Sequence, residues 1–382
     1  MAAAGTSLFG LRLAALVSFA GTTVAVACPF CGPVGRSLAE RRDASGAVLI
    51  AEALRAAARD ADGLLVQPFA VLAAIRGDVP PQAGVEAARV EASIAGTAVL
   101  FCIADGERLR CEAIPADEAV IDHVAQAPAV EEPAERRLRW FAARLEHPNE
   151  AIAADAFTEF GLAPFESVCQ VADALDATRL RTWLADESID RRRRGFYGLA
   201  LGLAARTGDA ASRVDTVAAL RAAVDAPGSD LRAGYDGILA GLLVADGAAA
   251  LDELTRRGLF AATTRAGDAR HALAALRFAW ESLDDSIPPA SVAAATAGLL
   301  DNPAVAADVA VDLARERRWE DLDRVVALWS TLGRDDPLVR RAVAGYLEAC
   351  PLPAALTHRE RLAAAEPVAW QAARAAAASP AR

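Results

Sequence analysis

The residues of this chain whose type and spacing could support chemistry are its cysteines. Two of the six stand in the motif Cys28-Pro29-Phe30-Cys31. A Cys-x-x-Cys pair exchanges disulfides when its first thiol lies at a helix N-terminus that lowers its pKa, usually behind a strand of a βαβ unit. The sequence shows no such unit around this motif. We therefore interpret Cys28 and Cys31 as structural disulfide cysteines and keep thiol–disulfide exchange as the alternative.

The residues around these cysteines argue against haem and zinc. A haem attachment motif needs His after the second cysteine, where this chain has Gly32. A zinc site would need two further ligands, and Cys102 and Cys111 lack the spacing of a zinc knuckle. The sequence therefore predicts neither a metal nor another cofactor.

Cys102 and Cys111 occupy matching positions on either side of a turn. Segments 97–103 and 108–114 flank Ala104-Asp105-Gly106-Glu107, the clearest β-hairpin signal in the chain. The spacing allows these two cysteines to bond to each other or to the N-terminal pair. The disulfide candidates are Cys28, Cys31, Cys102 and Cys111.

The other two cysteines, Cys169 and Cys350, fall in helical segments about 180 residues apart. Distant elements of a one-dimensional stack of helices do not touch. We expect both to be free thiols in the core.

The remaining polar residues form no catalytic pattern. The chain has no G-x-S-x-G, no HExxH and no Gly-rich phosphate loop. We interpret the run Arg191–Arg194 as a solvated face paired with the neighbouring acids Asp186, Glu187 and Asp190. The four histidines are scattered: His123, His147, His271 and His358. No catalytic residue is assigned, and the sequence predicts a protein that is not an enzyme.

Charge excludes one class of partner. The formal net charge is −11, and all 40 basic residues are arginines. An acidic surface repels phosphate backbones, so we expect another protein and no nucleic acid as partner.

Residues 1–27 read as a signal peptide. Arg12 is the only charge from Leu8 to Ala27, residues 13–20 are apolar, and Ala25-Val26-Ala27 matches an A-x-A cleavage site. We expect export to the periplasm or the outside of the cell, where disulfides persist. Two alternatives place the protein at a membrane: an uncleaved signal, or lipid attached to Cys28.

Residues 28–127 are predicted to form a small β-rich domain. Alternating or apolar segments at 46–51, 63–78, 85–92, 97–103 and 108–114 are separated by turn signals. Five short strands of this kind suggest a small barrel. The alternative is a looser α+β module in which residues 52–61 are helical.

Residues 128–133 are predicted to form a linker. After Pro133 the spacing of apolar residues becomes helical, and it stays so through 134–382. Helix pairs of about 35–45 residues over this length describe an α-solenoid. Later helices are predicted to begin after Asp176, Ser188, Asp209, Ser229, Asp246, Pro288, Pro303, Asp335 and Pro353, where capping residues or Pro stand.

Two parts of the chain resemble known modules. The N-terminal cysteines, Val48–Ala53 and Leu72–Asp78 resemble netrin-like modules of the OB-fold class over about residues 28–127. In those modules such cysteines tie the chain start to the barrel, but their spacing is Cys-x-Cys, so neither the disulfide pattern nor protease inhibition is carried over. His147–Phe157 resembles the second-helix entry of HEAT repeats, and Asp335–Val343 repeats that style.

The whole layout is similar to a family of exported bacterial proteins with a Cys-Pro-x-Cys start and HEAT-like helices. The matching stretches are Arg137–His147, Asp155–Phe160 and Ala349–Pro353. That family brings no activity with it. We therefore expect an exported, non-enzymatic protein-binding or scaffold protein that uses a helical-repeat surface, with thiol–disulfide exchange or a lipid-anchored surface protein as alternatives.

Overall fold

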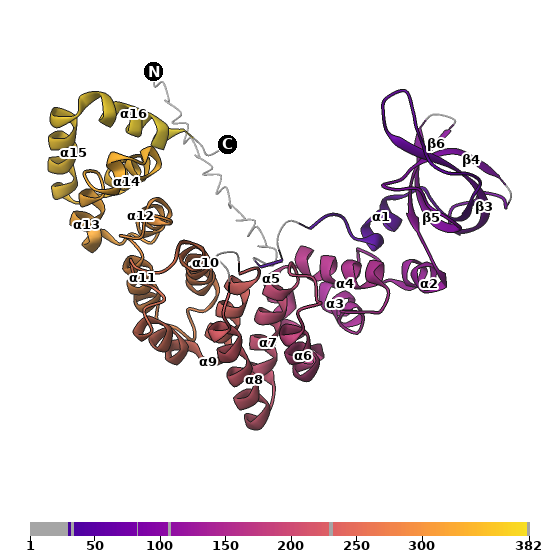
Figure 1. Ribbon diagram of the computed structural model, residues 1–382, viewed down its shortest axis with the longest axis horizontal. Coiled ribbons are helices and arrows are strands. Elements are labelled where there is room, and N and C mark those ends of the chain that lie inside the picture. Colours follow the sequence, from indigo (N-terminus) through magenta and orange to yellow (C-terminus); the bar gives the residue numbers. More distant parts are fainter. Residues whose placement is uncertain (1–29, 32–33, 82, 106–107, 229–231, 380–382) are drawn as a thin grey trace, which may run out of the picture.

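A computed structural model describes residues 30–31, 34–81, 83–105, 108–228 and 232–379 of the chain. The predicted signal peptide and Cys28 lie outside these residues. The fold is α+β and mostly helical, with a small N-terminal sheet followed by helices as far as the C-terminal region (Figure 1). The predicted fold class is confirmed at this level.

The N-terminal module holds one short helix and six strands within the described residues. Ser37 caps the helix, because its hydroxyl accepts from Glu40 N while the Glu40 carboxylate accepts from Ser37 N. No helix forms at 52–61, where the alternative interpretation placed one. The elements are α1 (Leu38–Ala44), β1 (Ala47–Ala53), β2 (Ala58–Arg59), β3 (Leu65–Arg76), β4 (Gly84–Arg89), β5 (Thr97–Asp105) and β6 (Arg108–Pro115).

The strands form one mixed sheet in the order β1-β5-β6-β4-β3-β2, and β1 also pairs with β3. The pair β4–β6 is parallel and joins only Ala88 to Cys111 and Arg89 to Glu112. The other pairs are antiparallel. The predicted barrel is therefore corrected to a sheet, because this two-pair seam leaves most of β4 and β6 unpaired with each other.

The two faces of the sheet bury different clusters, as the period of two along a strand requires. Leu49, Phe69, Leu100 and their neighbours form a core of their own on one face. On the other face, Val48 and Val99 pack with residues of the first helices after the sheet. Helices thus cover part of this second face, and Ile103 of β5 remains 39% exposed.

The helices that follow run from Glu118 to Ala378. Three are short 3₁₀ segments: η1 (Ala172–Ala174), η2 (Trp319–Asp321) and η3 (Leu332–Arg334). The α-helices are α2 (Glu118–Gln126), α3 (Ala134–Ala142), α4 (Glu150–Leu162), α5 (Phe165–Gln170), α6 (Ala177–Ala185), α7 (Arg194–Thr207), α8 (Ala210–Asp225), α9 (Tyr235–Arg256), α10 (Ala266–Ser282), α11 (Pro289–Gly298), α12 (Ala306–Arg315), α13 (Leu322–Ala327), α14 (Pro337–Ala349), α15 (Pro353–Ala365) and α16 (Pro367–Ala378).

Several predicted helix starts are confirmed by their caps. Asp176 accepts from Thr178 N, and Asp209 accepts from Ser212 N, at the starts of α6 and α8. The start after Ser188 is wrong, because a turn at Asp190 delays α7 to Arg194. The start after Asp246 falls inside α9, where Gly247 (φ 57°) interrupts the helix. Ser229 lies outside the described residues.

The helices follow an arch in Figure 1, in which α7 packs on α9, α12 on α14 and α14 on α16. Within the described part of the chain, no helix is long and apolar enough to cross a membrane. The closest approach joins α7 and α9. A Cβ on Gly202 would lie 2.2 Å from the carbonyl oxygen of Gly241, and one on Gly198 would lie 2.6 Å from Cα of Ile238. Backbone contact of this kind admits only glycine.

The start of the described chain packs into the middle of this arch. Phe30 is 7% exposed, and its ring lies 5.2 Å from that of Phe278 on α10. A Cβ on Gly195 of α7 would lie 2.9 Å from the carbonyl oxygen of Phe30. The segment then runs past α5 and α4 to α1 (Figure 1). One short segment therefore contacts helices more than 80 residues apart, which a stack with purely local contacts does not provide.

We expect Gly202→Ala to destabilise the helical part by about 3 kcal/mol, because the added methyl group must push two backbones apart. Thermal unfolding followed by circular dichroism measures this. The matched control is Gly345→Ala in α14, whose added Cβ meets only the Ala377 methyl at 3.7 Å. That change should leave the protein equally stable or slightly more stable. Equal behaviour of the two variants would contradict the close α7–α9 contact.

A carboxylate near the end of α12 makes stability depend on pH. Burial, with help from the charge of Asp312, raises the pKa of Glu316 from 4.5 to about 7. One of its buried oxygens lacks a hydrogen-bond partner. The folded state therefore binds this proton more tightly than the unfolded state does. The resulting stability is present below pH 4.5 and is lost as the pH rises to about 7.

Glu316→Gln should remove this dependence. We expect the variant to be more stable than the parent by about 1 kcal/mol at pH 8, after allowance for solvent screening of this half-exposed group, and equal to it near pH 4.5. Melting temperatures at both pH values test this. Glu360→Gln, at an exposed position of α15, is the control. A loss of stability at pH 8 in the Glu316 variant would refute the assignment.

Candidate functional site

The structure separates the four disulfide candidates. Cys102 and Cys111 are bonded to each other across β5 and β6, with their Cα atoms 4.1 Å apart. Cys31 is also disulfide bonded, but it is 3% exposed and belongs to the helical core. Cys28 lies outside the described residues. Of the two pairings that the sequence left open for the sheet cysteines, the structure has Cys102 bonded to Cys111.

Cys169 and Cys350 are free thiols, half-buried and buried respectively. Burial raises the pKa of the Cys169 thiol, which keeps it protonated and unreactive. Both agree with the expectation of structural cysteines.

The run Arg191–Arg194 departs from the expected solvated face at one position. Arg192 pairs with Asp190 at 2.7 Å on the surface, as expected. Arg193 is 2% exposed and pairs with Glu146 at 3.0 Å and with Glu150. This arginine joins the start of α7 to the turn before α4, so its role is structural.

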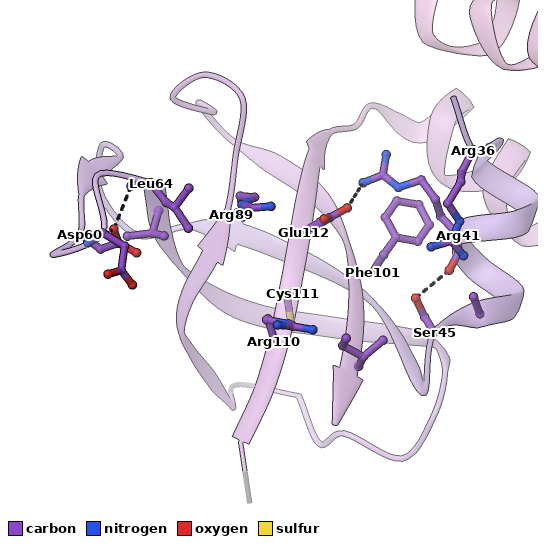
Figure 2. A pocket seen from close by; sticks show the side chains of 14 residues that line it. Arg36, Arg41, Ser45, Asp60, Leu64, Arg89, Phe101, Arg110, Cys111 and Glu112 are labelled. Atoms are coloured by element: carbon purple, nitrogen blue, oxygen red, sulfur yellow. Dashed lines mark hydrogen bonds and ion pairs between the residues drawn. The ribbon is translucent and has the colours of Figure 1, made fainter. Parts of the chain in front are cut away.

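A cavity with charged walls lies on the outer face of the sheet (Figure 2). Its volume is about 690 Å³. A second cavity of about 470 Å³ shares Arg41, Arg89 and Glu112 with it and continues across the β4–β6 seam. We call the two together the seam groove. The first cavity is lined by Arg36, Arg41, Ala44, Ser45, Asp60, Asp62, Leu64, Val66, Arg89, Phe101, Ile103, Arg110, Cys111 and Glu112.

The alternation of side chains along β5 and β6 determines which residues form the floor of the groove. Phe101 lies opposite Glu112, and Ile103 lies opposite Arg110. Successive side chains point to opposite faces, so the disulfide between Cys102 and Cys111 points into the sheet core while these four residues face the groove. Ile103 is 39% exposed, which gives the floor an apolar surface open to solvent.

Arginines determine the charge of the groove. The guanidinium of Arg41 lies 4.4 Å from the Phe101 ring centre and 3.4 Å from Glu112. Burial against this ring lowers the pKa of Arg41. Arg89 and Arg110 are exposed and have neither an ion pair nor a side-chain hydrogen bond with any described residue. Figure 2 shows both between the two walls of the groove. Two guanidinium groups are therefore free to bind an anion.

One wall is the turn between β2 and β3. The Asp60 carboxylate accepts from Asp62 N and Leu64 N, at 3.0 and 2.8 Å. This Asx-type turn holds Leu64, 39% exposed, at the edge of the groove.

The other wall is α1, which is fixed to the helices. The buried Arg42 donates to the carbonyl oxygens of Val124 at 3.0 Å, Ala127 at 2.5 Å and Pro128 at 3.2 Å. It thereby satisfies carbonyl groups at the end of α2. Asp43 accepts from Val130 N at 2.9 Å. The predicted linker is thus held rigidly against α1.

A buried carboxylate completes this attachment. Asp155 of α4 accepts from Leu38 N at 2.6 Å and from the His123 ring of α2 at 2.8 Å. Next to it, Glu159 pairs with Arg137, and burial raises the pKa of Glu159. His123, Asp155 and Glu159 are each at most 5% exposed. Buried polar groups that pair with each other and with backbone fix one relative placement of sheet and helices.

The groove offers charged and apolar groups to a ligand. The lining residues include no histidine, and the one cysteine is bonded. The Ser45 hydroxyl donates to Arg41 O at 2.7 Å. In the described ranges, no group of three or more His, Cys, Asp or Glu side chains is arranged to hold a metal. Guanidinium groups above an apolar floor suit recognition of carboxylates next to apolar groups.

Sequence reasoning missed Arg36, Arg41, Arg89 and Arg110, because they come from separate segments of the chain and form no recognisable motif. The available signal was the alternation in Arg108-Leu109-Arg110-Cys111-Glu112. It places Arg110 and Glu112 on one face, but the strand order that adds Arg89 could not be read from it.

We expect Asp155→Leu to lower the free energy of unfolding by about 3 kcal/mol, because it leaves a buried N–H and a buried ring nitrogen unpaired. It should also expose residues 128–133 to limited proteolysis. Asp173→Asn, which breaks an exposed pair with Arg139, should leave the stability close to that of the parent. Unchanged proteolysis in the Asp155 variant would contradict its role as the attachment point.

Comparison of the chain with family models, with curated proteins and with solved structures gives no match.

Proposed function

We propose that this chain is an exported, non-enzymatic scaffold that binds another protein, and that the seam groove is its recognition site. The observation that carries the proposal is the pair of free guanidinium groups, Arg89 and Arg110, beside an exposed apolar floor. The surrounding wall is held to the helices by buried hydrogen bonds of Arg42 and Asp155. A preformed site on a rigid frame binds without an ordering cost.

The finer fold assignments belong to the same proposal. We propose a HEAT-like solenoid for the helices, supported by the packing of α7 on α9, α12 on α14 and α14 on α16. Export and the family resemblance rest on the sequence features of residues 1–27 and on the Cys-Pro-x-Cys start.

Two alternatives are less well supported. Thiol–disulfide exchange needs an accessible sulfur, and Cys31 is 3% exposed beneath helices. Lipid attachment concerns Cys28, outside the described residues, and would anchor the same scaffold to a membrane surface.

Alkylation tests the thiol alternative. In the native protein under mild reductant, we expect Cys31, Cys102 and Cys111 to stay unmodified, because each is at most 3% exposed. All three should become reactive after reduction in denaturant. Ready opening of the Cys31 disulfide in the native protein would favour the redox alternative.

Site-specific photo-crosslinking in the native host tests the binding site. A benzoylphenylalanine in place of Ile103 should trap one discrete protein partner. The control position is Val368 of α16, which is 81% exposed and far along the arch (Figure 1). Adducts at Val368 alone would move the recognition site to the helices, and no adduct at either position would count against a protein-binding role.

A further inference from the structure

We propose that the seam groove takes an extended, acidic peptide segment of the partner, with carboxylates on Arg89 and Arg110 and an apolar side chain on the floor between the walls. This inference rests on the proposed function and names the chemistry of its ligand.

The two arginines are spaced for side chains of one strand. Arg89 lies opposite Glu112 in the register of β4 and β6, and Arg110 stands two residues before Glu112 on the same face. Diagonal neighbours of this kind lie about 7–8 Å apart. Alternate side chains of an extended peptide are separated by about 6.6 Å. Two carboxylates at positions i and i+2 can therefore reach the two guanidinium groups together.

The apolar surface beside the two arginines indicates that the ligand also carries an apolar side chain. Leu64 and Ile103 are each 39% exposed and lie on opposite sides of the arginine pair. Arg41 covers the Phe101 ring next to Ile103. A ligand that only neutralised charge would leave these groups in water. An apolar side chain of a peptide would cover them and add the hydrophobic term.

The acids in the groove select against a densely charged ligand. Asp60, Asp62 and Glu112 stand beside the four arginines. A polyphosphate or a polyuronate would place charge against these carboxylates at every step. A peptide can set its backbone N–H groups or a neutral side chain there. Charge complementarity on a chain of net charge −11 therefore favours an acidic segment mixed with neutral residues.

The width of the sheet determines the length of the peptide segment that the groove can hold. The groove crosses β5, β6, β4 and β3, which spans about 15 Å at the usual strand spacing. About five residues of extended chain cover this distance. The second cavity, lined in part by 90–95 and 112–115, continues past Arg89 and leaves room for flanking residues.

Titration of the full-length mature protein with defined peptides tests the inference. The probe is a rhodamine-labelled peptide Leu-Ser-Glu-Ser-Glu-Ser-Leu, whose Glu and Leu side chains share one face when the chain is extended, and its matched peptide has Gln in place of Glu. We expect the acidic peptide to bind at least about tenfold more tightly than the Gln peptide, with an affinity that falls as salt is added. Arg89→Gln with Arg110→Gln should weaken it about tenfold.

The matched control is the double change Arg55→Gln with Arg270→Gln, which removes the same charge from exposed arginines outside the groove. This variant should bind like the parent. Equal binding of the two peptides, or equal loss in both double variants, would overturn the inference. Tighter binding of a polyuronate than of the acidic peptide would overturn it in favour of a carbohydrate ligand.

The two proposals fail in different ways. If Ile103 traps a protein in the host but the arginine variants bind the acidic peptide normally, the peptide inference fails and the scaffold stands. If neither Ile103 nor Val368 traps a protein, the scaffold proposal fails whatever the peptides do.

Discussion

The carboxylate of Asp155 is the constraint on which the relation between sheet and helices depends. It is 5% exposed and accepts hydrogen bonds from the backbone of α1 and from His123 of α2. A buried carboxylate without partners is costly, so these three elements have one favourable arrangement. Because α1 also forms a wall of the seam groove, the same buried bond that joins the two parts of the molecule shapes the proposed binding site.

The helices are held together by contacts of a different kind. Glycines let α7 and α9 touch along their backbones, and the segment at Phe30 and Cys31 packs against α7 and α10. A stack of helix pairs is held by neighbour contacts alone. Here a segment from the far end of the chain adds contacts that link distant pairs. The helical part is thereby a stiffer frame for the groove than a simple stack would be.

The groove also shows why the net charge of the whole chain is a poor guide to the charge of its ligand. The net charge of −11 argues against anionic partners, yet Arg89 and Arg110 are unpaired at one spot on the sheet. Salt screens charges beyond about 8–10 Å, so a ligand in the groove responds to the nearby arginines more than to the distant acids. An acidic ligand and an acidic protein are therefore compatible.

The sequence by itself determined features that depend on local spacing. The hairpin turn at 104–107 placed Cys102 opposite Cys111, Asp176 and Asp209 announced helix starts, and the change of period after Pro133 separated sheet from helices. Each depends on residues close in the chain, where backbone geometry leaves few choices.

Only the tertiary structure decided which distant residues meet. Cys31 packs among helices and not against the sheet, Arg193 is buried by Glu146, and the parallel seam brings Arg89 beside Glu112. The number of strands had suggested a barrel, but β4 and β6 pair at only two positions and the strands form a sheet. The physical reason is that strand order and the docking of a segment are set by the burial of whole faces and by pairing of buried charges. These depend on all contacts at once, and no periodicity in the sequence records them.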